Sequence, residues 1–180
     1  MRWDRLFEDL EAQLEAQARR ERDAEVADRT RAERARITWG ERLVGATGDD
    51  LSIRVRGGAS VAGELQDTGD GWLLLLTPHG RSVIVATTAV VGVHGLRRAP
   101  QDDTRARRFG LGYALRGISR DRRPVVVTDI DRSDAHGTID VVGADSFDLA
   151  EHPLDAPRRP GNVRAVRTVP FAAVATITSP

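Results

Sequence analysis

The sequence predicts a mainly β protein with helices, in which a long N-terminal α-helix precedes two tandem small β-barrels of five strands each. Three observations support this prediction. Residues 1–39 contain neither Gly nor Pro and are rich in Ala, Glu and Arg, which favours a helix. The pattern of Gly63–Leu75 returns at Gly137–Leu149, and each copy leads to a second matched piece, Val85–Val93 or Val169–Ile177. Short apolar segments between frequent turns are typical of small barrels.

The helix carries an apolar stripe only at its beginning. Four large apolar residues follow a four-three-four spacing that places them on one face, and the stripe lapses after two heptads: Trp3, Phe7, Leu10 and Leu14. From Arg19 to Arg36 the helix carries oppositely charged pairs, which is typical of a solvated face. The helix is too long to lie wholly on one barrel, so either it spans both barrels or the four apolar residues form an oligomerisation seam with another chain. Of these we favour the seam, in a homodimer.

The first barrel is expected over residues 49–96, after a helical segment of residues 1–48 that breaks near Trp39–Gly40. Leu51, Ile53 and Val55 alternate as a first strand, and the following Gly-Gly pair permits the positive φ of a hairpin turn. The other four strands are predicted at Val61–Leu65, Trp72–Leu76, Ser82–Val85 and Ala89–Val93. The second of these is expected to be buried.

Residues 97–123 are predicted to form an Arg-rich connecting helix. Leu111, Leu115 and Ile118 share one face of it. The segment holds nine arginines against three aspartates, the strongest charge bias in the chain. Five of these arginines are candidate phosphate contacts, with Tyr113 nearby for base stacking: Arg105, Arg107, Arg108, Arg116 and Arg120. The alternative is an ion-pair surface, because residues 129–155 hold eight acids and one arginine.

The second barrel is expected over residues 124–180. Its strands are predicted at Val125–Val127, Thr138–Val142, Phe147–Ala150, Val163–Val169 and Val174–Ile177, with a Pro-rich loop at Glu151–Asn162. The two copies are offset by 74 residues before this loop and by 84 after it. The register of the third strand stays open, because Phe147 could correspond to Trp72 or to Leu73.

A helix followed by five short strands, with a Gly-x-Leu/Ile strand and a terminal Ala-Val-x-x-Val/Ile strand, resembles the Sm-like fold of the bacterial RNA chaperone Hfq. Other SH3-like barrels share this pattern, and the whole chain also resembles uncharacterised proteins of GC-rich bacteria. The resemblance implies a fold but not the family's RNA pocket. Gly69 and Gly143 stand where Sm proteins have Asp, and neither Val85–Thr87 nor Val169–Phe171 matches the Tyr-Lys-His segment of Hfq.

The composition excludes several classes of protein. The formal net charge is zero, which argues against a whole-molecule field that attracts nucleic acid or membranes. The chain has no Cys, so disulfides, thiolate metal sites and thiol nucleophiles are excluded. The start of the chain is charged and lacks the apolar region of a signal peptide, and no apolar run could span a bilayer. We expect a soluble, cytoplasmic protein without a membrane partner.

The sequence matches catalytic and metal-binding motifs only weakly. Asp129–Asp140 mimics a calcium loop, but Asp134 occupies the position that needs Gly, which favours a hairpin turn. Four histidines lie singly, without metal-ligand spacing: His79, His94, His136 and His152. No Gly-x-Ser-x-Gly sequence occurs. We therefore expect no catalytic residues, no metal and no cofactor.

Two function classes follow. The favoured one is a non-catalytic interaction or scaffold protein, in which the tandem barrels present edges and loops to a protein partner and the N-terminal helix self-associates. The alternative is a nucleic-acid-binding protein, with RNA as the expected ligand, that acts through the Arg-rich segment of residues 97–123. An enzyme is not expected, because the sequence contains no catalytic constellation.

Overall fold

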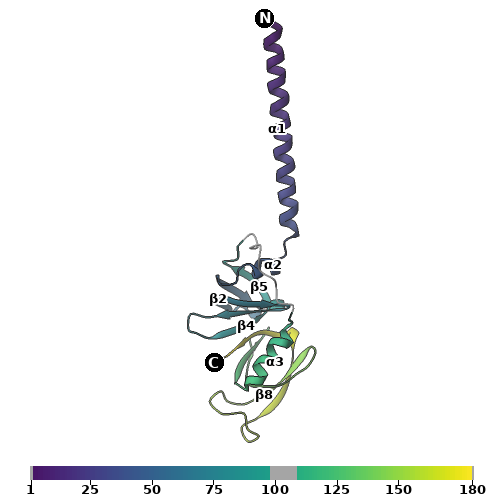
Figure 1. The fold of residues 1–180 in the computed structure, drawn as a ribbon. Coiled ribbons are helices and arrows are strands. Elements are labelled where there is room, and N and C mark those ends of the chain that lie inside the picture. Colours follow the sequence, from purple (N-terminus) through teal and green to yellow (C-terminus); the bar gives the residue numbers. More distant parts are fainter. Residues whose placement is uncertain (1, 98–108, 180) are drawn as a thin grey trace. The chain divides into compact units, whose positions relative to one another are not determined.

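The computed structural model describes the backbone of residues 2–97 and 109–179 and, within the first helix, the side chains of residue 13 and of residues 15 onward. The chain divides into two compact units, Met1–Trp39 and Gly40–Pro180. The first unit contains the long helix α1 (Arg2–Arg36), and the second contains all the described strands (Figure 1).

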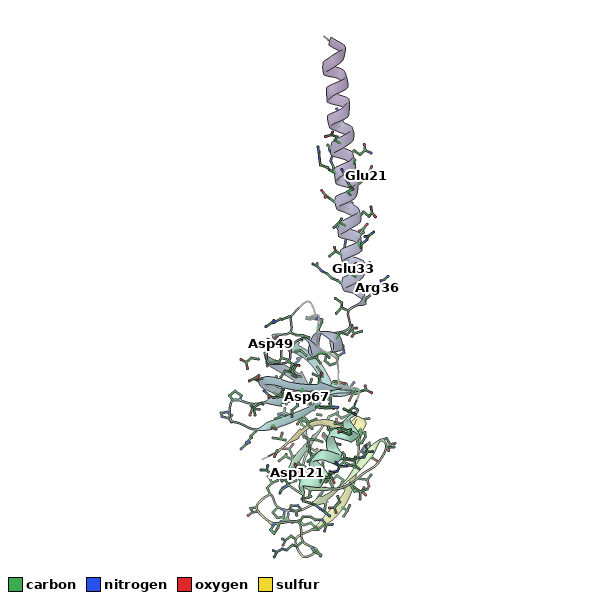
Figure 2. The ribbon with its side chains drawn as sticks, in the orientation of Figure 1. Glu21, Glu33, Arg36, Asp49, Asp67 and Asp121 are labelled. Atoms are coloured by element: carbon green, nitrogen blue, oxygen red, sulfur yellow. The ribbon has the colours of Figure 1, made fainter. Side chains whose placement is uncertain are left out.

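The helix α1 is continuous over 35 residues, as the sequence predicts. It ends at Arg36, and α2 (Trp39–Val44) begins after two non-helical residues, so the break lies just before the predicted position. Its described side chains are nearly all exposed, as Figure 2 shows for Glu21, Glu33 and Arg36. Opposite charges pair along this surface at helical spacing: Arg19 with Glu15, Arg29 with Glu25 and Arg31 with Asp28.

The described strands fall into two sets of five with the same order of elements. The first half comprises β1 (Asp50–Val55), β2 (Ser60–Gly69), β3 (Trp72–Leu76), β4 (Ser82–Ala86) and β5 (Val90–His94). The second half follows the helix α3 (Leu111–Asp121) and comprises β6 (Val125–Asp129), β7 (Asp134–Val142), β8 (Ser146–Glu151), β9 (Ala165–Pro170) and β10 (Val174–Thr178). A 3-10 turn precedes the last strand of each half, at Thr87–Ala89 and at Phe171–Ala173.

The ten strands form one open antiparallel sheet in the order β5-β1-β2-β3-β4-β10-β6-β7-β8-β9. The mainly β class is therefore confirmed, but the two separate five-stranded barrels expected from the sequence are not what the described residues show. The last strand of the second half pairs with the fourth strand of the first half, with Thr176 opposite Val85 and Ile177 opposite Ile84. This pairing joins the halves into a continuous sheet.

The strands at the centre of the sheet are buried on both faces, because each face packs against the hydrophobic cluster of a different half. Successive side chains of a strand point to opposite faces. In β3, Leu73 and Leu75 belong to one hydrophobic cluster, whereas Trp72 and Leu74 contact another. The same alternation occurs in β4. The strand β10 also contributes to both clusters, with Val174 and Ile177 in one and Ala175 in the other, across an irregularity in its pairing with β6. A strand buried on both faces needs a continuous apolar sequence, which explains the run Trp-Leu-Leu-Leu at residues 72–75.

Each cluster contains the interior of one half. The first is built on Leu51, Ile53 and Leu65, with Leu43 of α2 packed into it. The second is built on Ile139, Phe147 and Leu149, and α3 covers it with three residues on one face: Leu111, Leu115 and Ile118. The predicted apolar face of the connecting helix is therefore confirmed. The helix α3 packs against β7, and Figure 1 shows it lying on the strands of the second half.

The internal repeat extends to the strand register. The pairing of β2 with β3 shifts between Leu65 and Asp67, and that of β7 with β8 shifts between Ile139 and Val141, which are positions 74 residues apart. The same offset relates the pair Thr68–Leu73 to the pair Val142–Phe147. Phe147 therefore corresponds to Leu73 rather than to Trp72, which settles the register that the sequence left open.

None of the helices in the described parts of the chain is long and apolar enough to cross a membrane.

Candidate functional site

The exposed face of α3 carries one aromatic and two arginine side chains, and a second aromatic side chain lies just before the helix. Tyr113, Arg116 and Arg120 are separated by three and four residues, a spacing that aligns side chains along one face of a helix, and Phe109 lies two residues before the helix begins at Leu111. All four are exposed, with 48% of Phe109 and 57% of Tyr113 accessible. Large apolar side chains that are exposed together are uncommon and often mark interaction sites. We call these four residues the α3 stripe.

The two rings of the α3 stripe stack on each other. Their centroids lie 4.3 Å apart and their planes differ by 16°. Aromatic pairs of this kind contribute about 0.5–1.5 kcal/mol beyond the area that they bury. The pair therefore holds two exposed rings in one orientation instead of leaving two independent side chains.

Hydrogen bonds from the first half of the sheet position the start of the α3 stripe. The indole Nε1 of Trp72 donates to the carbonyl oxygen of Phe109 at 2.9 Å, and the backbone N–H of Asp70 donates to the same oxygen at 3.0 Å. Gly69 makes this approach possible, because a Cβ there would lie 2.3 Å from Nε1 of Trp72 and 2.5 Å from the Phe109 oxygen. The helix therefore starts at a fixed point on the β2–β3 hairpin.

The arginines around α3 divide into paired and available ones. Arg122 lies 3.3 Å from Asp140, so part of the predicted ion-pair surface exists. Arg97 lies 2.7 Å from Asp49, which is outside the acidic segment of that prediction. By contrast, Arg116 donates one hydrogen bond of 3.3 Å to the carbonyl of Gly143, and Arg120 forms no ion pair with the residues that the structure describes. Both guanidinium groups retain donors for a ligand.

The other predicted site residues lie outside the described part of the structure. Arg105, Arg107 and Arg108 fall in residues 98–108, which the structure does not describe. Trp3, Phe7, Leu10 and Leu14 belong to α1, but their side chains are not described. Because the backbone of α1 is one continuous helix, their spacing places the four positions on one stripe.

An apolar cavity of about 390 Å³ lies beneath the C-terminal half of α3. Its walls come from the helix and from the strand face that the helix covers, with apolar contributions from Trp72, Leu74, Ile84, Ile118 and Ile177. Asp121 (Figure 2) and Arg123 also line it. The cavity has the volume of a small ligand site, although its lining contains no cluster that would assign it a chemistry.

The Asp-rich segment forms a hairpin turn, as predicted. One carboxylate oxygen of Asp129 accepts hydrogen bonds from the backbone N–H groups of Asp131 and Ser133, each at 2.9 Å. The hydroxyl of Thr128 donates to Asp134 at 2.7 Å. These bonds use the carboxylates to close the β6–β7 turn. Within the described residues, no group of three or more acidic or His side chains is arranged to hold a metal ion.

His152 is the buried exception among the histidines, with 3% of its surface exposed. Its Nδ1 lies 2.8 Å from the carbonyl oxygen of Pro153, which can only accept, so Nδ1 carries the proton. In the neutral ring, Nε2 then accepts from the hydroxyl of the fully buried Thr138 at 2.8 Å. The pair ties β7 to the loop after β8.

The same loop is held at a second point. Nε of Arg158 donates to one oxygen of Asp140 at 2.8 Å and Nη2 donates to the other at 2.5 Å, which is a bidentate pair. The hydrogen bond to Asp140 and its negative charge raise the pKa of Arg158 above its ordinary value. The bidentate pair keeps the Pro-rich loop on β7.

Sequence reasoning selected Tyr113, Arg116 and Arg120 but missed Phe109 as part of the same surface. Phe109 lies before the first helical residue, Leu111, so its stack with Tyr113 depends on the path of the chain into α3 and not on helical spacing. The cavity beneath α3 and the bonds from Trp72 and Asp70 could not be found from the sequence either, because they depend on contacts between distant segments.

A comparison of the sequence with protein-family models gives no match, and a comparison with curated proteins also gives none. The similarity to the Sm-like fold therefore remains a prediction.

Proposed function

We propose that this chain is a non-catalytic interaction protein that self-associates through α1 and presents the sheet unit to a partner. The observation that carries this proposal is α1 itself. It is a 35-residue helix whose described side chains, from residue 15 onward, are nearly all exposed. A polar helix of this kind gains little from packing within one chain, and a partner helix that covers an apolar seam would stabilise it.

The seam proposed for this contact is Trp3, Phe7, Leu10 and Leu14, and the proposed assembly is a homodimer. Two heptads are marginal for a coiled coil in isolation. A dimer that depends on them should therefore be sensitive to charges placed within the seam.

Light scattering on the full chain tests this proposal. We expect the wild type to have twice the mass of one chain, and Leu10→Asp/Leu14→Asp to be monomeric. The matched control is Ala12→Asp/Ala16→Asp, which adds the same charges on the opposite side of the helix. If both double variants keep the mass of the wild type, the seam does not drive assembly, and a monomeric wild type overturns the proposal directly.

We also propose that the two halves descend from one duplicated Sm-like module. Support comes from the shared order of strands, the shared register shifts and the matched 3-10 turns. The open sheet would then be two such modules joined through β4 and β10, with each five-strand set keeping its own apolar interior.

A second candidate function is nucleic-acid binding, which the alignment of stacked rings with available arginines on α3 favours. The zero net charge of the chain means that binding would rely on local contacts rather than on a long-range field. Anisotropy titrations of labelled RNA and DNA at about 50 mM salt, which favours phosphate contacts, test it. Absence of binding under this condition would remove the second candidate.

A further inference from the structure

We propose that the α3 stripe is a platform for single-stranded nucleic acid, in which bases stack on the Phe109–Tyr113 pair and the backbone phosphates contact Arg116 and Arg120. This inference rests on the nucleic-acid-binding function proposed above and names its ligand. It is carried by the stacked geometry of the rings, their exposure, their fixed attachment to the sheet and the availability of both arginines.

The rings determine the class of nucleic acid. An aromatic side chain stacks on the face of a base, and that face is accessible only when the base is unpaired and unstacked from its neighbours. With 57% of Tyr113 exposed, its ring is open to a ligand while Phe109 supports it at 4.3 Å. A duplex could reach the two arginines but not the rings, so it would lose the stacking contribution.

The arginines lie at a distance that suits a short strand. Along a helix that rises 1.5 Å per residue, Arg120 lies about 10 Å from Tyr113 along the helix axis, which a strand of a few nucleotides can span. Arg116 lies between them on the same face. A strand that stacks a base on Tyr113 and follows the helix would therefore meet both guanidinium groups in turn.

The platform is preorganised, which reduces the entropic cost of binding. The carbonyl of Phe109 is held by Trp72 and by the backbone of Asp70, at 2.9 and 3.0 Å. On the other side, Leu111 and Leu115 are buried in the second cluster. The helix thus presents the α3 stripe without needing to fold on contact with a strand.

Fluorescence anisotropy with the full chain tests the inference. The probes are labelled single strands of about 12 nucleotides, one RNA and one DNA, and a duplex of the same length. We expect both single strands to bind more tightly than the duplex. Tyr113→Ala should weaken single-strand binding by about 5- to 160-fold, the range that stacking on one aromatic ring contributes, and Tyr113→Phe should preserve it.

The arginines are tested by salt dependence. Each phosphate contact to a single strand contributes about −0.7 to the slope of log affinity against log salt. Arg116→Gln and Arg120→Gln should each make the slope shallower by about that amount. Arg54→Gln removes an exposed arginine of β1 and should leave the slope unchanged. Unchanged circular dichroism and unfolding midpoints show that each variant remains folded.

Three results would overturn the inference, and each has a different meaning. If the wild type binds neither single strands nor duplex, nucleic-acid binding itself fails. If duplex binds as tightly as single strands and Tyr113→Ala has no effect, the arginines bind phosphates without a stacking platform. If polyglutamate competes as well as a single strand of equal charge, the surface recognises acidic polymers, and an acidic protein becomes the better ligand.

Discussion

Gly63 and Gly137 hold equivalent places in the two halves, and each is required by a close backbone contact. A Cβ on Gly63 would lie 2.4 Å from the carbonyl oxygen of Leu76, and a Cβ on Gly137 would lie 2.1 Å from that of Ala150. The contacting residue is thirteen positions further along in both cases. A repeated glycine in an alternating strand is thus explained by the close approach of the neighbouring strand's backbone.

We expect Gly63→Ala and Gly137→Ala each to lower the free energy of unfolding by about 1–3 kcal/mol, because the new methyl group overlaps with a neighbouring strand. Urea unfolding of the full chain measures both changes. Gly92→Ala is the matched control, since a Cβ on this strand glycine of β5 would have nothing within 4 Å. Tolerance at Gly63 or Gly137 equal to that at Gly92 would contradict the close approach.

The buried pair of Thr138 and His152 gives a second prediction at the scale of single residues. Thr138→Val keeps the shape of the side chain but removes the donor to Nε2 of His152. A buried acceptor left without a partner costs about 1–3 kcal/mol, and we expect a loss of stability of this size.

The control for Thr138→Val is Thr128→Val, in which an exposed hydroxyl loses its bond to Asp134. Water can replace that bond, so the change in unfolding free energy should stay within about 0.5 kcal/mol. Equal effects in the two variants, measured by urea unfolding, would mean that the buried bond is not important for stability.

At the scale of elements, α3 is a helix that its own sequence weakens. It contains Gly112 and Gly117, and glycine inside a helix costs about 0.5–1 kcal/mol relative to alanine. The two glycines differ in their surroundings. A Cβ on Gly112 would lie 3.2 Å from the ring of Phe171, whereas a Cβ on Gly117 would have nothing within 4 Å.

We therefore expect Gly117→Ala to raise the free energy of unfolding by about 0.5–1 kcal/mol, because it removes backbone entropy from the unfolded chain without a clash. Gly112→Ala should gain less, since Phe171 must move. Thermal unfolding of the two full-length variants compares them. A larger gain at Gly112 than at Gly117 would show that the helix does not pack on Phe171 as described.

Most elements could be predicted from the sequence because their signals are local. The alternation of Leu51, Ile53 and Val55 marked β1, and the apolar run at residues 72–76 marked β3. The interval between α1 and α2 was predicted within a few residues. For the candidate site, Arg116, Arg120 and Tyr113 were visible as a charge bias and a nearby ring, whereas the stack with Phe109 and its support by Trp72 required the fold.

The pairing of β4 with β10, which joins the two halves, was not predicted, although the sequence of β4 indicates that it is an interior strand. In β4, Val83, Ile84 and Val85 are all apolar, as expected for a strand buried on both faces. The equivalent residues of β9, 84 positions later, include Arg167 and Thr168, which are exposed and bond to Glu151 and Asp148. The repeat made the two strands look alike, but only one of them has the sequence of an interior strand.

The same difference explains where the sheet ends. An edge strand exposes unpaired backbone groups, and polar or charged side chains and proline protect it from pairing with other chains. On β9 these features are Arg167, Thr168 and Pro170. β4 lacks them and pairs with β10 inside the chain. The whole sheet is thus continuous at its centre and protected at this end.

The shared central strands predict that the sheet unit unfolds in one cooperative transition. Leu65 belongs to the first cluster and Leu149 to the second, yet β3, β4 and β10 contribute side chains to both clusters. If the residues of one cluster unfolded, the three shared strands would lose the packing on one face, and the other cluster would lose strands on which it is built. Scanning calorimetry of the full chain should show a single peak for the sheet. Leu65→Ala and Leu149→Ala, at about 2–5 kcal/mol each, should lower the same peak by about 5–15 °C. Two peaks, each shifted by only one of the variants, would instead describe independent domains.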